Sequence, residues 1–109
     1  MGYKQPQDIN INGTNLDVIL DNHKLWLAGK GGERANLKGA NLEDADLEDA
    51  NLKGVNLYMA NLAGANLEDA NLEWASLEDA NLEYANLERA SLEGANLNGC
   101  TGTPYVQGK

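Results

Sequence analysis

A five-residue pattern recurs without a gap from residue 35 to residue 99, and it limits the folds open to this chain more than any other feature. Each of the thirteen copies begins with a small residue, which is Ala except at Val55, continues with Asn, Asp or Ser, and has Leu in third place. The fourth and fifth residues vary. The leucines of the pattern are Leu37, Leu42, Leu47, Leu52, Leu57, Leu62, Leu67, Leu72, Leu77, Leu82, Leu87, Leu92 and Leu97.

A period of five excludes one continuous α-helix or β-strand for this stretch. Residues five apart in a helix are rotated by about 140°, so the leucines would wind around it without forming one face. In a strand, an odd spacing sends successive leucines to opposite faces. The pattern fits a chain that is extended for about three residues and then turns a corner, with Ala and Leu inside and Asn outside. Such a chain is a solenoid whose coils contact only their neighbours.

Residues 35–99 resemble the pentapeptide-repeat family, whose pattern is Ala-(Asn/Asp)-Leu-x-x. The resemblance implies an all-β solenoid, a right-handed quadrilateral β-helix with four pentads in each coil. The period alone leaves three or four sides open. With four sides the thirteen pentads make about three coils, and residues twenty apart stack. We then expect the Asn side chains to form hydrogen-bonded ladders along the stack.

Residues 1–34 form a lead-in with one predicted helix, at about residues 15–28. Thr14 to Asp17 resembles a capping box with Asp in place of Glu, and Gly29 is the expected C-cap. This stretch is similar to the lead-ins of bacterial members of the family. We expect the helix to cover the N-terminal end of the solenoid, because an open end invites association. Its predicted apolar face, with Trp26 at the margin, contains Leu16, Ile19, Leu20, His23 and Leu27.

Residues 100–109 leave the pattern and form the predicted C-terminal cap or tail of this single domain. Cys100 falls where the next pentad would place its inward Ala. Pro104 cannot donate to a ladder of backbone hydrogen bonds, and Tyr105 and Val106 are expected to cover the last coil. Because this cover is thin, we predict a monomer or a weak homodimer formed through the C-terminal end.

The charge of the chain excludes direct binding to nucleic acid. The formal net charge is −9, and residues 35–99 alone carry −10, whereas phosphate contacts need a basic surface. The sequence has no apolar run long enough to cross a membrane, and its first residues lack the apolar core of a signal peptide. We expect a cytoplasmic protein without membrane contact, which agrees with its single cysteine.

The variable positions hold the candidate contact residues. One predicted column is acidic and the other candidates are aromatic. The acidic column either solvates the rod or docks on a basic partner, and the aromatic residues either pack over neighbouring glycines or mark a protein contact. The candidates are Glu48, Asp49, Glu68, Asp69, Glu88, Tyr58, Trp74 and Tyr84.

The residues predict no catalysis. The single histidine, His23, lies on the apolar face of the predicted helix, and the chain has no Cys/His cluster, phosphate-binding loop or metal motif. We therefore predict no enzyme and no cofactor, but a structural or protein-interaction module whose protein partner is unknown. The family resemblance implies one alternative, a DNA mimic that binds DNA gyrase or a related type II topoisomerase, as in quinolone resistance. Such relatives are typically much longer dimers.

Overall fold

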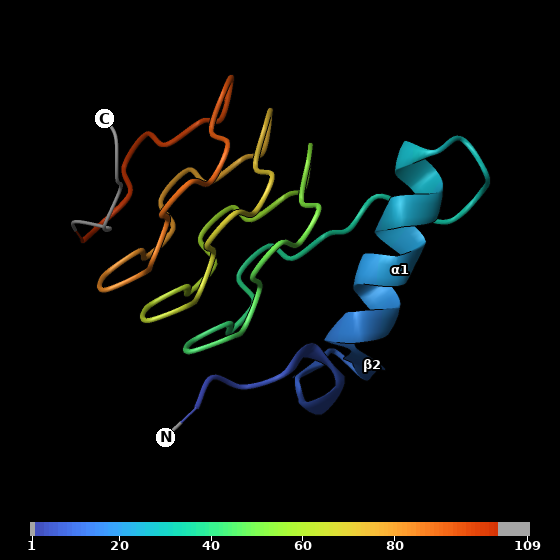
Figure 1. Ribbon diagram of the computed structural model, residues 1–109, viewed down its shortest axis with the longest axis horizontal. Helices are drawn as coiled ribbons and strands as arrows, with labels where there is room; N and C mark the ends of the chain where they lie inside the picture. The colour runs from blue at the N-terminus through green and yellow to red at the C-terminus, as the bar shows by residue number, and fades with distance from the viewer. Residues whose placement is uncertain (1, 103–109) are drawn as a thin grey trace.

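The computed structural model describes residues 2–102, which form a short N-terminal subdomain and a rod of stacked coils (Figure 1). The N-terminal part begins with a 3-10 turn and a two-stranded antiparallel hairpin and ends with one helix. The rod follows from residue 35 onward. The regular elements are η1 (Pro6–Asp8), β1 (Asn10–Ile11), β2 (Thr14–Asn15) and α1 (Leu16–Leu27).

Parallel bridges in the rod join residues twenty positions apart, such as Asn36 to Asn56 and Asn56 to Ser76. Four pentads therefore return the chain to the same side of the rod. The N–H of Leu37 donates to the carbonyl of Asn56 at 2.8 Å, and the equivalent bond recurs in successive pentads. Each contact is a single bridge rather than a long ladder, because the chain turns a corner every five residues.

The interior of the rod is filled by the first and third residues of each pentad. The eleven leucines from Leu37 to Leu87 are 0–1% exposed, and most of the Ala side chains between them are also buried. Burial weakens toward the C-terminal end, where Leu92 is half-buried and Leu97 is exposed. The inward placement of Ala and Leu follows from the alternation of side chains in an extended triplet.

The second residue of the pentad bonds mainly to its own turn. In most pentads its side-chain oxygen accepts the backbone N–H two residues later, as Asn71 does from Glu73 at 2.9 Å. The expected ladders between coils are sparse: Asn56 donates to Asn36 at 3.3 Å, and no side-chain bond links Asn41 to Asn61 within residues 2–102. Asn and Asp form such local turns readily, which explains their preference here.

The fifth residue of the pentad has a left-handed backbone conformation. Ala40 closes a four-residue turn by donating its N–H to the carbonyl of Leu37 at 3.0 Å, and the third residue of that turn, Gly39, has φ +67°. Type II turns have a positive φ at this place and favour Gly there. Non-glycine residues also occupy it. They are Asp44, Asp49, Met59, Asp69, Trp74, Asp79, Tyr84 and Arg89, with φ between 60° and 63°.

The prediction of a capping box before the helix is wrong. Thr14 belongs to strand β2, which pairs with β1 through a turn at Asn12 and Gly13, and both turn residues have positive φ. Asn15 stands at the N-cap without a side-chain hydrogen bond. The N–H of Leu16 instead donates to the carbonyl of Ile9 at 2.8 Å. The hairpin thus supplies the acceptor that a capping side chain would otherwise provide.

Helix α1 lies beside the end of the rod formed by the first coil, opposite the C-terminal coil (Figure 1). Leu16 and His23 are fully buried, while Ile19 and Leu20 pack against the core. After α1 ends, Gly29 takes φ +72°, the left-handed conformation expected just beyond a helix. No helix within residues 2–102 has the length and apolar character needed to cross a membrane.

The segment before η1 adds a contact that the sequence pattern does not predict. Lys4 forms a parallel bridge with Ala45, donating its N–H to the carbonyl of Asp44 and accepting the N–H of Asp46, both at 2.8 Å. This segment therefore supplies hydrogen bonds to one side of the first coil. At the other end of the chain, Pro104, Tyr105 and Val106 lie outside the described residues, so the predicted cover over the last coil stays a prediction.

We expect Leu67→Ala to lower the free energy of unfolding by about 2–5 kcal/mol. Leu67 is 0% exposed in the middle of the rod, and truncation leaves a cavity between coils that cannot close freely. Urea unfolding followed by circular dichroism measures the loss. Glu43→Gln, at an exposed corner, is the control and should change stability by less than about 0.5 kcal/mol. A Leu67→Ala variant as stable as the wild type would contradict an inward-facing leucine.

Candidate partner-binding surface

The twenty-residue repeat distributes the candidate residues over all four edges of the rod. The acidic residues share one edge, which we call the acidic edge: Glu48, Asp49, Glu68, Asp69, Glu88 and Arg89. The three aromatic candidates occupy the other edges separately. Going around the rod in the direction of the chain, the edge of Trp74 follows the acidic edge, and the edge of Tyr58 comes next. Tyr84 lies on the remaining edge, opposite Trp74. The structure therefore brings the carboxylates together but leaves the aromatic side chains apart.

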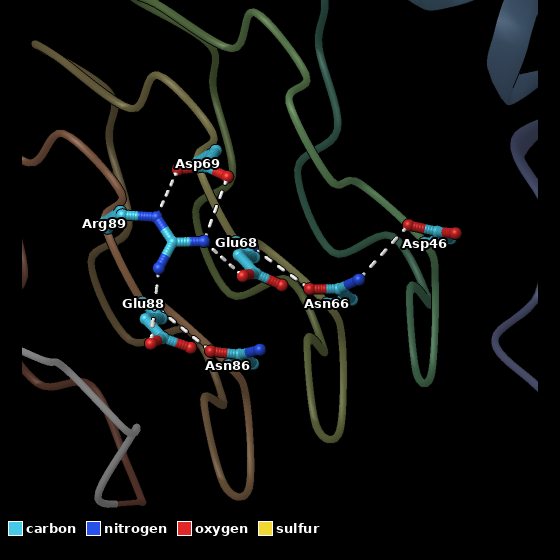
Figure 2. Close-up of polar contacts among 7 residues, drawn as sticks. All are labelled: Asp46, Asn66, Glu68, Asp69, Asn86, Glu88 and Arg89. Carbon is cyan, nitrogen blue, oxygen red and sulfur yellow. Dashed lines mark hydrogen bonds and ion pairs between the residues drawn. The ribbon is translucent and has the colours of Figure 1, made fainter.

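Arg89 gathers three carboxylates on the acidic edge (Figure 2). Its Nε lies 2.9 Å from Asp69 Oδ1, its Nη1 lies 3.3 Å from Glu88 Oε2, and its Nη2 bonds to Glu68. The hydrogen bond to Asp69, followed by that to Glu68, raises the pKa of Arg89, so its charge is permanent. The guanidinium is half exposed, so these ion pairs add little to stability.

Within residues 2–102 the carboxylates of Glu48 and Asp49, in the N-terminal half of the acidic edge, form no ion pair. Partial desolvation, followed by repulsion from neighbouring carboxylates, raises the pKa of the Glu48 carboxyl above its usual range. Neighbouring carboxylates on this edge thus disfavour the charged form of Glu48. The repelling carboxylates, in order of their effect, belong to Glu68, Asp49, Asp46 and Asp69.

A groove runs between helix α1 and this half of the acidic edge. The helix contributes Asp17 and Asp21 to its walls, and Leu20 contributes apolar surface. The one basic side chain among the lining residues is Lys24. From the rod and the N-terminal segment the groove is lined by Asp46, Leu47, Glu48, Asp49, Ala50, Asn51, Pro6 and Gln7. Sequence analysis missed the contribution of α1, because no local pattern indicates which coil a helix faces.

The three aromatic candidates have different surroundings. The ammonium of Lys38 lies 5.7 Å from the ring centre of the half-buried Tyr58, a cation–π contact. The Trp74 ring covers Gly94, where an added Cβ would overlap it, and remains 63% exposed. Tyr84 is 88% exposed. Trp74 is thus partly a packing residue, whereas Tyr84 buries almost nothing.

Two side chains lie against glycines of the rod in ways that the repeat pattern does not indicate. The side chain of Asp44, not that of Tyr84, lies against Gly64. Trp26, predicted only at the margin of the apolar face, is exposed and lies against Gly54, on the edge that carries Trp74. Side chains at this corner lean toward the following coil, which a one-dimensional repeat does not reveal.

The single histidine and the single cysteine of the chain are both partly or fully buried. His23 is fully buried, and both of its ring nitrogens make hydrogen bonds. Cys100 is half-buried with its Sγ 3.0 Å from the carbonyl of Leu77, and burial raises the pKa of its thiol, which keeps it a thiol at neutral pH. Within residues 2–102 no three His, Cys, Asp or Glu side chains are grouped so that they could hold a metal ion.

The chain belongs to the pentapeptide-repeat family. The family pattern described as pentapeptide repeats (8 copies) matches residues 33–69 and 70–101, which are the residues that form the rod. Members of this family form right-handed quadrilateral β-helices and are generally non-enzymatic structural or interaction modules. None of the curated proteins compared with this chain matches it.

Two solved structures similar to this chain come from cyanobacteria. The pentapeptide repeat protein Rfr23 from Cyanothece 51142 is 44% identical, with a TM-score of 0.63, over 65% of this chain and 49% of that protein. This chain therefore spans about half the length of Rfr23. A pentapeptide repeat protein from Nostoc Pcc 7120 is 32% identical, with a TM-score of 0.40, over 78% of this chain and 84% of that protein.

We expect Tyr84→Gly to raise the free energy of unfolding by about 0.5–1 kcal/mol, because it relieves a left-handed backbone and loses almost no packing. The comparison variant is Trp74→Gly, which removes the same strain but also the contact of the ring with Gly94. It should therefore gain less or lose stability. Chemical denaturation of both variants measures the difference. A destabilised Tyr84→Gly protein would show that the tyrosine makes a stabilising contact.

Proposed function

We propose that this protein is a non-enzymatic interaction module that docks on a basic protein surface through the groove between α1 and the acidic edge. In this proposal the rod is a right-handed β-helix of about three coils, which the bridges from Asn36 through Asn56 and Ser76 to Asn96 support. Helix α1 serves as its N-terminal cap and forms one wall of the groove. The expected location stays the cytoplasm.

The observation that carries this proposal is the uneven distribution of charge along the acidic edge. Arg89 pairs with Glu68, Asp69 and Glu88 near the C-terminal half. In the N-terminal half, Asp46, Glu48 and Asp49 line the groove together with Asp17 and Asp21 of α1, against the single basic side chain of Lys24. Uncompensated charge of one sign attracts a partner of the opposite sign and speeds encounter with it.

The rod leaves only its corners for recognition. Ala and Leu are committed to the core, and the Asn oxygens accept hydrogen bonds from their own turns. A partner therefore meets the fourth and fifth residues of the pentads or the N-terminal elements. On the acidic edge those residues are carboxylates held on a rigid frame, which lowers the entropy cost of docking.

The DNA-mimic alternative receives less support from the same charges. A mimic of duplex DNA needs negative charge continued along its length, because it replaces a regular series of phosphates. Arg89 interrupts the acidic edge at Asp69 and Glu88. The negative region is thus short and concentrated near α1, which suits a compact basic surface better than a DNA-binding channel.

We expect the double variant Glu48→Gln, Asp49→Asn to lose binding to a basic partner, because it removes charge from the centre of the groove wall. The matched control, Glu43→Gln with Asp44→Asn, makes the same charge change on a neighbouring edge. Proteins retained from lysate of the native host by immobilised wild-type chain would be identified, and their affinities measured by calorimetry at two salt concentrations. We expect a loss of about 5- to 30-fold in affinity for the groove variant, since removing two charges costs about 1–2 kcal/mol.

An equal effect of both double variants would contradict a docking site in the groove and indicate a general charge effect. Retention that does not weaken with salt would contradict a charge-driven contact.

We also propose that two copies associate weakly through the C-terminal ends of their rods. Leu97 is 40% exposed there, and Leu92 is half-buried. Leu97→Glu should keep the protein monomeric at concentrations where the wild type begins to dimerise. Leu25→Glu, at a similarly exposed leucine of α1, is the control and should dimerise like the wild type. Light scattering after size exclusion measures the mass, and a wild type monomeric throughout would rule this contact out.

A further inference from the structure

His23 joins helix α1 to two separate parts of the rod. Its Nδ1 accepts the backbone N–H of Ala35 at 3.0 Å, and its Nε2 lies 2.8 Å from the backbone carbonyl of Lys53. Ala35 begins the first pentad and Lys53 lies in the fourth. The ring is fully buried and stacks on Trp26 with 5.5 Å between ring centres. One side chain of α1 thus bonds to both the first and the fourth pentad of the first coil.

These two contacts define one protonation state of the ring. A nitrogen that accepts an N–H carries no proton, so Nδ1 is bare and Nε2 donates to the Lys53 carbonyl. Protonation would place a hydrogen on Nδ1, directly opposite the N–H of Ala35. The cation would lose one hydrogen bond, bring two donors together and remain buried. The docked arrangement therefore accommodates only neutral imidazole.

We propose that neutral His23 holds α1 on the rod through its two hydrogen bonds, and that protonation of the ring releases the helix and the lead-in. Release would uncover Leu16 on the helix and the inner surface of the first coil around Leu37, both of which are fully buried in the docked state. The rest of the rod would stay folded, since its coils are bonded to one another independently of α1.

Among the charged side chains near His23, that of Arg34 opposes protonation of the ring. Lys24 follows His23 on α1, Glu33 and Arg34 precede Ala35 in the lead-in, and Lys53 presents its carbonyl from the rod. No carboxylate within residues 2–102 forms an ion pair with the ring. Burial, and to a smaller extent the Arg34 guanidinium, lowers the pKa of His23, while the bond to Lys53 partly offsets them.

The direction of this shift sets the pH range of release. A histidine freed from the rod titrates near its ordinary pKa of about 6.5. The docked form has a lower pKa, so the open form binds protons more readily. Docking is therefore at full strength above about pH 6.5 and weakens as the pH falls below it. If the docked ring stays neutral, the open fraction rises up to about 30-fold between pH 7.5 and pH 5.

The test uses the unmodified protein, because His23 is its single histidine. In a sample with labelled histidine, NMR should show a ring protonated at Nε2 at pH 7.5 and a titration midpoint below 6.5. Hydrogen exchange measured between pH 7.5 and 5 and corrected for the intrinsic pH dependence should show that the amides of Ala35 and α1 lose protection. The amide of Leu67, in the middle of the rod, should keep it. A midpoint at or above 6.5, or equal loss of protection throughout the chain, would overturn the proposal.

The variant His23→Gln distinguishes the effect of His23 protonation from a general effect of acid on the stability of the protein. A glutamine amide offers an acceptor oxygen and a donor NH₂ group but does not titrate in this range. If the variant folds, protection of its α1 amides should not depend on pH between 7.5 and 5. A variant that loses protection at pH 5 as the wild type does would count against His23. If the variant does not fold, the NMR midpoint and the exchange pattern of the wild type still decide.

Discussion

At the fifth residue of each pentad the backbone takes a positive φ, and the turn made there directs the chain onto the next side of the rod. Every other feature of the rod depends on this turn. Because it recurs every five residues, residues twenty apart meet as parallel bridges, and the leucines between them lose contact with water. The left-handed conformation costs most side chains about 1–2 kcal/mol, and burial of the leucines offsets that cost.

The same turn decides where the surface can vary. Gly and Asp suit a left-handed backbone, but Trp74, Tyr84 and Arg89 occupy it as well. Arg89 uses the position to reach carboxylates from two coils, and its ion pairs leave the negative charge of the acidic edge concentrated near α1. The proposed docking groove is therefore a consequence of one arginine at one corner as much as of the acidic residues themselves.

The contacts that attach the N-terminal segment and α1 to the rod are not repeated along the chain. They combine isolated hydrogen bonds from distant parts of the chain, such as Lys4 with Asp44 and His23 with Lys53. A rod of repeated coils can tolerate the loss of one contact, since its neighbours repeat it. The attachment of α1 depends on single contacts and cannot tolerate such a loss. One buried imidazole can therefore control whether α1 stays on the rod in our proposal.

The sequence by itself determined the solenoid, its inward Ala and Leu, and a helix close to the one observed, because regular spacing reports which side chains share a face. The second strand of the hairpin, β2, was not predicted, although Asn12-Gly13 is a strong local signal for a hairpin turn. Only the tertiary structure decided the bridge made by Lys4, the two partners of His23, the three carboxylates of Arg89 and the groove against α1. These contacts join residues distant in the chain, and no local period encodes which non-repeated segment meets which coil.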